Sequence, residues 1–119
     1  MTIEEIMRNS NQPLDFTNSQ VEIREVSFGK DKARGQVLVD GDIYQLNGIA
    51  RAVFDNSDIY EGQFKRDKLN GFARSIHVNG AYYQGMWKDN KKHGKGIMVL
   101  ASGETQEGIF IENKFTGAN

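Results

Sequence analysis

The sequence contains no cysteine and only one proline among its 119 residues. Without cysteine there is no disulfide framework and no thiolate metal site. No apolar run approaches the roughly 20 residues of a membrane-spanning helix. The first residues, MTIEEIMRNSNQ, show neither an apolar secretory core nor an arginine-rich transit pattern. We therefore expect a cytoplasmic protein, either peripheral to a membrane or part of a larger assembly.

The sequence also lacks an excess of charge of one sign. It has 15 basic and 16 acidic residues, with a net charge of -1. This balance argues against binding to nucleic acid through overall charge. The two histidines, His77 and His93, have no second ligand at a metal-binding spacing, and no nucleophile or phosphate-loop arrangement is present. We expect no enzyme activity, no cofactor and no metal site.

Glycine is abundant instead, with 13 residues, and six of them fall in two columns with a period of 23 residues. The columns are Gly48, Gly71 and Gly94, then Gly62, Gly85 and Gly108. Aromatic residues follow the same period at Phe64, Trp87 and Phe110. Residues 46–68 and 69–91 agree at ten of 23 positions. A fixed period of this kind is the signature of a repeat architecture.

Each repeat contains a signal for a β-hairpin. Asn79-Gly80 is a favoured type I′ turn, because both central positions of that turn need positive φ. Asn56-Ser57, Ser102-Gly103 and Asp40-Gly41 are weaker versions. We expect strands of roughly six or seven residues beside each turn and longer loops, such as Lys65–Asn70, between hairpins. The product is an all-β antiparallel meander.

The predicted turn at Asn79-Gly80 also fixes which side chains share a face of the sheet. It places three pairs together: Ile76 with Tyr83, Arg74 with Gly85, and Phe72 with Trp87. The same rule places the corresponding aromatic residues of the other repeats on that face. The sequence therefore predicts an aromatic stripe with glycine gaps along one side of the sheet.

At these residues the sequence resembles the MORN (membrane occupation and recognition nexus) repeat family. Tyr60–Phe64 and Tyr83–Trp87 match the family's opening motif, Tyr-x-Gly-x-Trp, and Lys92–Gly96 is close to its closing motif. The resemblance covers about three repeats in residues 46–117. Upstream, Gly35–Tyr44 resembles half of a degenerate repeat, and residues 1–34 do not match.

The resemblance implies a single-layer, twisted antiparallel sheet of stacked β-hairpins. We expect a repeat domain over residues 35–119, with hairpins at about 35–47, 48–65, 71–88 and 94–111. Residues 1–34 would form a separate N-terminal segment. Its pattern predicts a short helix near residues 2–8, a loop, and a strand over Val21–Phe28.

The resemblance further implies a non-catalytic scaffold that binds another protein, or a copy of itself, through an aromatic-lined face. The candidate residues are Tyr60, Phe64, Phe72, Arg74, Tyr83, Trp87 and Phe110. Two interpretations stay open for the rings, because they can contact a partner or pack as the core of the sheet. Arg74, like Arg51 one repeat earlier, is either an anchor for an acidic ligand or a side chain stacked on tyrosine.

An alternative function is peripheral binding to anionic phospholipid membranes through basic hairpin loops. The candidate residues are Lys88, Lys91, Lys92 and Lys95. Each cation near an anionic surface contributes about 1 kcal/mol. Salt would discriminate between the two functions, since attraction to lipid weakens as ionic strength rises.

The last predicted strand, Thr105–Ile111, has no complete repeat after it. Phe115-Thr116-Gly117 resembles only the start of a further unit. We therefore expect an exposed strand edge at this end, which would invite pairing with another chain.

Overall fold

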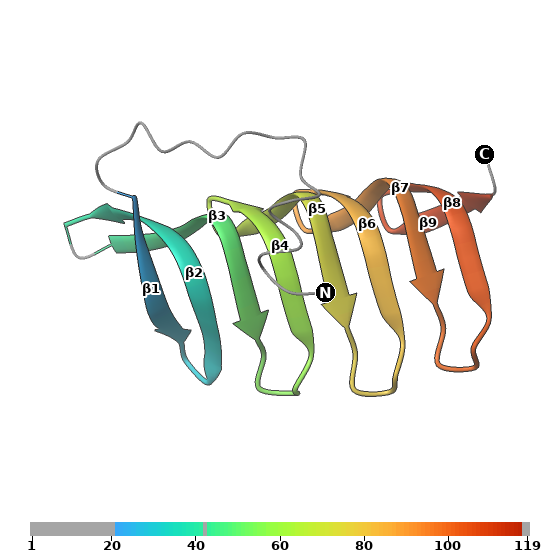
Figure 1. Cartoon of the computed structure of the whole chain (residues 1–119), viewed down its shortest axis with the longest axis horizontal. Helices are drawn as coiled ribbons and strands as arrows, with labels where there is room; N and C mark the ends of the chain where they lie inside the picture. The colour runs from blue at the N-terminus through green and yellow to red at the C-terminus, as the bar shows by residue number, and fades with distance from the viewer. Residues whose placement is uncertain (1–20, 42, 118–119) are drawn as a thin grey trace.

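The described part of the chain, residues 21–41 and 43–117 of a computed structural model, forms one antiparallel sheet of nine strands in chain order (Figure 1). The strands are β1 (Val21–Phe28), β2 (Asp31–Asp40), β3 (Ile43–Val53), β4 (Ile59–Lys65), β5 (Lys68–Ile76), β6 (Tyr82–Lys88), β7 (Lys91–Val99), β8 (Thr105–Ile111) and β9 (Lys114–Gly117). The predicted all-β meander and the predicted strand Val21–Phe28 are confirmed. The predicted helix near residues 2–8 lies outside the described residues.

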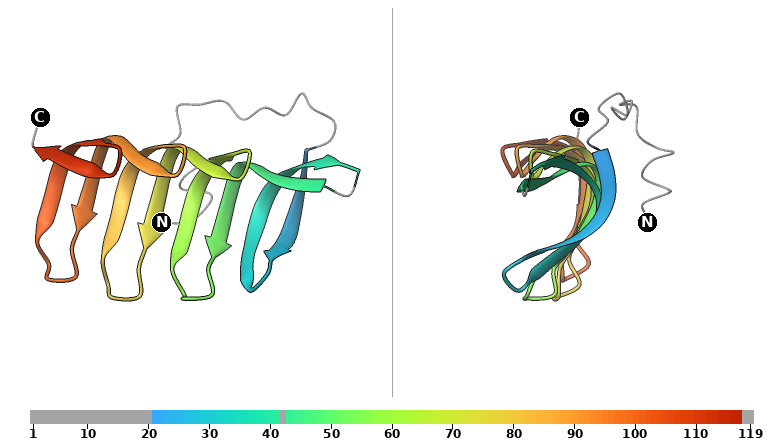
Figure 2. Two further views of the ribbon diagram at one scale, coloured as in Figure 1. Left: turned by 180° about the vertical axis from the view of Figure 1, so that it is seen from behind. Right: turned by 90° about the vertical axis from the view of Figure 1, so that its left-hand side faces the viewer.

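The strands bend together, so that the sheet forms a trough, as the end-on view in Figure 2 shows. Five-residue loops at 54–58, 77–81 and 100–104 lie along the lower edge of the sheet in Figure 1. Two-residue turns join the strands along the upper edge. From β3 onward the two edges therefore use different turn chemistry, and this difference sets the pairing of the strands; the two-residue turn between β1 and β2 also lies on the lower edge.

The observed pairing of β5 with β6 differs from the predicted register because of the loop that joins these strands. The N–H of His77 donates to the carbonyl oxygen of Ala81 at 2.8 Å, and the N–H of Gly80 donates to that of His77 at 2.9 Å. Gly80 has a φ of 92°, so this is a type I turn followed by a left-handed residue, not a two-residue turn. The extra loop residue moves the pairing by one position.

The observed pairs are Ile76 with Tyr82, Arg74 with Gln84, and Phe72 with Met86. The predicted pairs of Ile76 with Tyr83, Arg74 with Gly85 and Phe72 with Trp87 are therefore wrong. Because side chains alternate along a strand, a shift by one residue moves a whole strand's set of side chains to the other face. Phe72 and Arg74 consequently lie on the face opposite to Tyr83 and Trp87.

The tight two-residue turns lie at the other edge, where a longer loop over Lys65–Asn70 was expected. In each of them both residues have positive φ, as a type I′ turn requires. They are Arg66-Asp67, Asp89-Asn90 and Glu112-Asn113. The prediction of a longer loop is wrong, because asparagine and aspartate adopt the left-handed conformation at low cost and so replace glycine here.

Each of these turns is tied to the preceding repeat by two hydrogen bonds. The N–H of Asn90 donates to the carbonyl oxygen of Leu69 at 3.1 Å, and the N–H of Leu69 donates to Oδ1 of Asn90 at 2.8 Å. The same reciprocal pair joins Asp67 to Leu46 and Asn113 to Lys92. The contacts recur with the period of the repeat and fasten one unit onto the next.

Replacing Asn90 by alanine is expected to lower the free energy of unfolding by about 2 kcal/mol. The change leaves the N–H of Leu69 without its acceptor and holds alanine at a φ of 68°. Asn90→Gly removes the amide and keeps the backbone relaxed, so about 1 kcal/mol should be lost. Denaturant unfolding followed by circular dichroism measures both variants. Equal stability of Asn90→Ala and the parent would contradict the fastening role.

The glycines of the first column lie at β-bulges. In the pairs β2–β3, β4–β5 and β6–β7, the second strand contains extra residues at the bulge. Between Gly85 and Trp87 of β6, the paired residues of β7 run from Gly96 to Lys92. Gly94 lies in this bulge with a φ of 111°. Gly48 and Gly71 occupy the same place in β3 and β5, also at positive φ. A bulge bends its strand, so this column accounts for the trough.

The second glycine column belongs to a row of small residues that crosses seven strands. Neighbours in the row are paired across strands: Gly35, Ala50, Gly62, Ala73, Gly85, Gly96 and Gly108. A Cβ atom added at Gly85 would meet the backbone of β7, 2.5 Å from the carbonyl oxygen of Lys95. Only the smallest side chains fit where the strands approach so closely.

Candidate functional site

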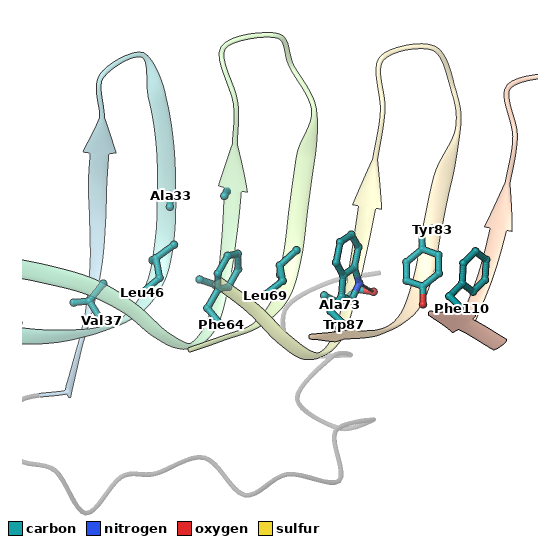
Figure 3. Close-up of a cluster of buried hydrophobic side chains, with 11 residues drawn as sticks. Ala33, Val37, Leu46, Phe64, Leu69, Ala73, Tyr83, Trp87 and Phe110 are labelled. Atoms are coloured by element: carbon teal, nitrogen blue, oxygen red, sulfur yellow. Dashed lines mark hydrogen bonds between the residues drawn. The ribbon is translucent and has the colours of Figure 1, made fainter. Parts of the chain in front are cut away.

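One face of the sheet, which we call the core face, carries the buried apolar cluster (Figure 3). The aromatic members of the cluster form a chain of edge contacts. Ring centroids are 5.2 Å apart for Tyr83 and Trp87, 5.0 Å for Tyr83 and Phe110, and 6.1 Å for Tyr60 and Trp87. Offset edge contacts of this kind stabilise beyond simple burial. The cluster spans several repeats and is the hydrophobic core of the described sheet.

The polar atoms of Trp87 and Tyr83 are satisfied within the sheet. Trp87 Nε1 donates to the carbonyl oxygen of Ala73 at 3.0 Å, and the hydroxyl of Tyr83 donates to that of Met86 at 2.9 Å. Tyr83 is fully buried, and burial raises the pKa of its hydroxyl to about 12. These two rings are therefore packed and hydrogen-bonded within the sheet.

The structure brings five of the seven predicted binding residues together and separates two. Those on the core face are Tyr60, Phe64, Tyr83, Trp87 and Phe110, and all but the half-buried Tyr60 are buried. Phe72 and Arg74 lie on the opposite face, which we call the open face. The prediction that all seven residues lie along one stripe is therefore wrong for Phe72 and Arg74. The role of these residues in binding stays a prediction.

The open face carries a transverse row of apolar side chains. They pair across five strands and are half-buried or exposed: Val53, Ile59, Ile76, Tyr82 and Val99. Phe72 and Met86, a further pair on this face, are half-buried and 37% exposed, respectively. The described residues form only this one sheet, so none of them adds a second layer over these side chains.

A charged row runs beside the apolar row on the open face. Its members pair from strand to strand: Glu25, Arg34, Arg51, Glu61, Arg74, Gln84, Ile97 and Glu107. Glu61 is only 4% exposed, and Nε of Arg51 lies 3.8 Å from its carboxylate. A buried carboxylate needs such a partner. The row therefore contains three arginines and three glutamates, and among these described residues only Arg51 and Glu61 form an ion pair.

Arg74 combines two features of this row. Its guanidinium carbon lies 5.4 Å from the centre of the Tyr82 ring. Stacking on tyrosine, one of the two interpretations of this arginine, is therefore present. Its Nε is buried and has no hydrogen-bond partner in the structure.

The comparison with protein-family models agrees with this periodic geometry. Residues 60–82 and 83–105 each match the model of the MORN repeat. These are two adjacent MORN repeats. No curated protein matches the chain. The MORN repeat is a non-enzymatic module associated with protein or membrane interaction.

A hollow lies on the open face, mostly on the second MORN repeat. Its floor and walls are contributed by β5 to β8: Phe72, Gln84, Met86, Lys95, Ile97 and Glu107, with backbone from glycines. Apolar atoms predominate, and three polar side chains stand among them. An apolar surface with a few polar groups is typical of a binding site.

The predicted lipid-binding lysines do not form one group. Lys88 and Lys91 are exposed beside the turn at Asp89-Asn90, and Lys95 is exposed on the open face. Lys92 is half-buried on the core face with Nζ 5.6 Å from the centre of the Tyr83 ring. Burial lowers the pKa of its amine. Lys92 thus packs against the core.

The turn edge nevertheless carries exposed cations from three turns. They are Lys65, Arg66, Lys68, Lys88, Lys91 and Lys114. The acids at the same turns are Asp67, Asp89 and Glu112. Among the described turns, this edge is therefore basic, and we call it the basic edge.

The loop edge contains a polar link between repeats. Nδ1 of His77 lies 3.1 Å from Oδ2 of Asp58, and the N–H of Val78 donates to Oδ1 of Asp58 at 3.2 Å. The hydrogen bond from His77, followed by that from Val78, lowers the pKa of Asp58. The link joins the loop at 54–58 to the loop at 77–81.

Acid should weaken this link. A protonated Asp58 is favoured more in the unfolded chain than in the folded chain, because the folded pKa is lowered. The contribution is therefore full above about pH 4, the usual range of aspartate, and is lost as the pH falls below it. Asp58→Asn, and likewise His77→Gln, should flatten the fall of melting temperature between about pH 5 and pH 3. An unchanged slope in both variants would contradict the link.

Neither histidine has a metal-like environment among residues 21–41 and 43–117, where no group of three His, Cys, Asp or Glu side chains is placed to hold a metal ion. In the same residues, no helix has the length and apolarity to cross a membrane.

Sequence reasoning missed the residues that fasten and bend the repeats. Asp67, Asn90 and Asn113 recur at one repeat position, and this column was the available signal for the tight turns. Oε1 of Gln63 accepts a hydrogen bond from the N–H of Phe72 at 2.6 Å, where the bulge interrupts the backbone pairing. Oε1 of Gln36 accepts from the N–H of Ile49 in the same way. Met86 and Ile109 stand at the equivalent positions of the later repeats, so no repeated residue type signalled this role.

Proposed function

We propose that the chain is a non-catalytic scaffold that binds a segment of another protein on the open face of its MORN-repeat sheet. The observation that carries this proposal is the apolar row over β3 to β7, which no second layer of described residues covers. Soluble proteins rarely leave a contiguous apolar patch exposed unless it binds something. The core face is less suited, because its rings are already packed.

The chemistry of the open face indicates what the segment contains. Phe72, Met86 and Ile97 would receive apolar side chains. Arg74 would orient an acidic residue, since its buried Nε has no hydrogen-bond partner in the structure. A segment with apolar and acidic residues fits both parts. Complementary charges across an interface contribute specificity and the rate of association.

A peptide library selected against the folded protein tests this proposal. We expect the selected peptides to be rich in apolar and acidic residues. Phe72→Glu and Arg74→Glu should each weaken their binding by at least tenfold, which corresponds to about 1.4 kcal/mol. Lys88→Glu at the basic edge is the matched control and should bind nearly as the parent does. Peptides that bind all three variants equally, or a selection that enriches nothing, would contradict the proposal.

A second candidate function is binding to anionic phospholipid, and the basic edge favours it. Six exposed cations from three successive turns line one side of the sheet. Such a row would meet a membrane surface edge-on, at about 1 kcal/mol for each cation that reaches it. A protein with this function would be cytoplasmic and peripheral to a membrane.

Co-sedimentation with vesicles separates the two functions. Lipid binding requires association with phosphatidylserine vesicles and none with phosphatidylcholine vesicles, and the association should fall as salt rises. Lys88→Glu combined with Lys91→Glu should abolish it, whereas Phe72→Glu should leave it intact. No sedimentation with phosphatidylserine at low salt would rule out the basic edge as a lipid site.

A further inference from the structure

The outer edge of β1 is a long edge without a neighbouring strand among the described residues. β1 has eight residues and pairs only with β2. The side chain of Ile23 is 74% exposed and that of Phe28 is 44% exposed. A free edge presents unpaired N–H and C=O groups to any strand that can align with it.

The other end of the sheet is better protected. β9 pairs with β8 and covers Ile109, Phe110 and Ile111. On the outer edge of β8, only Thr105–Gly108 has no neighbour among the described residues. The prediction of an open edge over Thr105–Ile111 is therefore wrong for Ile109, Phe110 and Ile111. β9 itself has only four residues, and a short edge strand is a poor template for pairing. β1 is therefore the stronger candidate for an interface.

The side chain of Arg24, in the middle of β1, contacts Tyr44 and Glu22. The guanidinium carbon of Arg24 lies 4.7 Å from the centre of the Tyr44 ring, and Nη1 donates to the Tyr44 hydroxyl at 3.1 Å. Nε donates to the carboxylate of Glu22. Within the described residues Nη2 has no hydrogen bond, so the guanidinium keeps N–H groups that can donate to a second carboxylate.

The order of charges along β1 is self-complementary in one register. In an antiparallel pair of two β1 strands, a two-fold axis at Glu22, Arg24 or Glu25 sets identical charges directly opposite each other. An axis at Ile23 sets Ile23 opposite Ile23 of the second copy. It also sets each Glu22 opposite an Arg24 on the same face, twice in the interface. Charge therefore selects the Ile23 register among these four.

We propose that β1 binds β1 of a second copy of this chain, antiparallel and centred on Ile23, to give a two-fold symmetric dimer with a continuous sheet. The two exposed isoleucines meet at the axis, and two pairs of Glu22 with Arg24 flank them. A two-fold interface closes on itself, so assembly stops at two chains. The open face and the basic edge are not used, and this dimer is independent of the proposed function.

Charge exchange at the two flanking positions tests the register. Sedimentation equilibrium up to about 1 mM chain should show a monomer–dimer equilibrium for the parent. Glu22→Arg and Arg24→Glu should each weaken the dimer by roughly tenfold, because both pairs become like-charged. The double variant Glu22→Arg/Arg24→Glu restores opposite charges and should return to within about threefold of the parent. Lys32→Glu, on the neighbouring strand, controls for net charge and should dimerise as the parent does.

A crosslink locates the axis independently of the charges. The chain has no cysteine, so Ile23→Cys introduces a single thiol at the proposed axis. Mild oxidation should convert this variant to a covalent dimer, whereas Ser27→Cys, on the same strand and face, should stay largely uncrosslinked. A parent that stays monomeric at the highest concentration, a double variant that does not recover, equal crosslinking of the two thiols, or a mass that grows beyond two chains would each overturn the proposal.

Discussion

Replacing Tyr83 by alanine is expected to lower the free energy of unfolding by about 3–5 kcal/mol, as is usual when a buried ring is removed. The side chain is fully buried, contacts Trp87 and Phe110 at once, and donates to the carbonyl oxygen of Met86. A small domain has only about 5–15 kcal/mol in total. The variant should therefore be close to unfolded at physiological temperature.

The neighbouring tyrosine supplies the control. Tyr82 is half-buried on the open face and stacks under Arg74. Tyr82→Ala should cost only about 1 kcal/mol, because a partly exposed ring loses less burial. Denaturant unfolding of both variants, with the same slope against denaturant concentration, gives the comparison. Equal losses, or a larger loss for Tyr82→Ala, would contradict the assignment of the two faces.

Replacing Gly85 by alanine is expected to cost roughly 3 kcal/mol or more, the upper range for overpacking. The added Cβ would lie 2.5 Å from the carbonyl oxygen of Lys95 and against the Cα of Gly96. Both obstacles are backbone of the adjacent strand, which cannot move aside without opening the small-residue row.

Gly103→Ala is the matched control for this prediction. Gly103 lies in the loop after β7, and no heavy atom lies within 4 Å of an added Cβ. The variant carries only the strain of alanine at a φ of 92°, about 1–3 kcal/mol. Thermal melts and denaturant unfolding compare the two variants. If Gly85→Ala were no less stable than Gly103→Ala, the close approach of β6 and β7 would be wrong.

The repeat, the fold class and the family resemblance were all predictable from the sequence, because they depend on local periodicity. Glycine and aromatic columns at a 23-residue spacing predict stacked hairpins wherever the turns lie. The strand over Val21–Phe28 was predictable for the same reason, since its side chains alternate. The repeat and the fold class can therefore be predicted even when the predicted position of a turn is wrong by one residue.

The membership of each face was not predictable, because it depends on a single residue of loop length. Asn79-Gly80 is a good two-residue turn by composition. Within the connection 77–81, however, the hydrogen bond from His77 to Ala81 closes a three-residue loop that also includes Val78. The competing tight turns at Arg66-Asp67 and its equivalents contain no glycine, and their conformation depends on hydrogen bonds to residues such as Leu46, distant in sequence. Composition alone does not reveal those long-range partners, and so Phe72 and Arg74 were grouped with the wrong rings.

The measurement that tests the division into a packed face and a free face most directly is the labelling of single thiols. Ser75→Cys places a thiol on the core face, where Ser75 is fully buried, and Met86→Cys places one on the open face. The absence of native cysteine makes each signal unambiguous. In the folded protein we expect the Met86→Cys thiol to react nearly as fast as in denaturant, and the Ser75→Cys thiol to react only through unfolding. Equal rates for the two thiols, or faster labelling at position 75, would contradict a core on the Tyr83 side and a free surface on the Arg74 side.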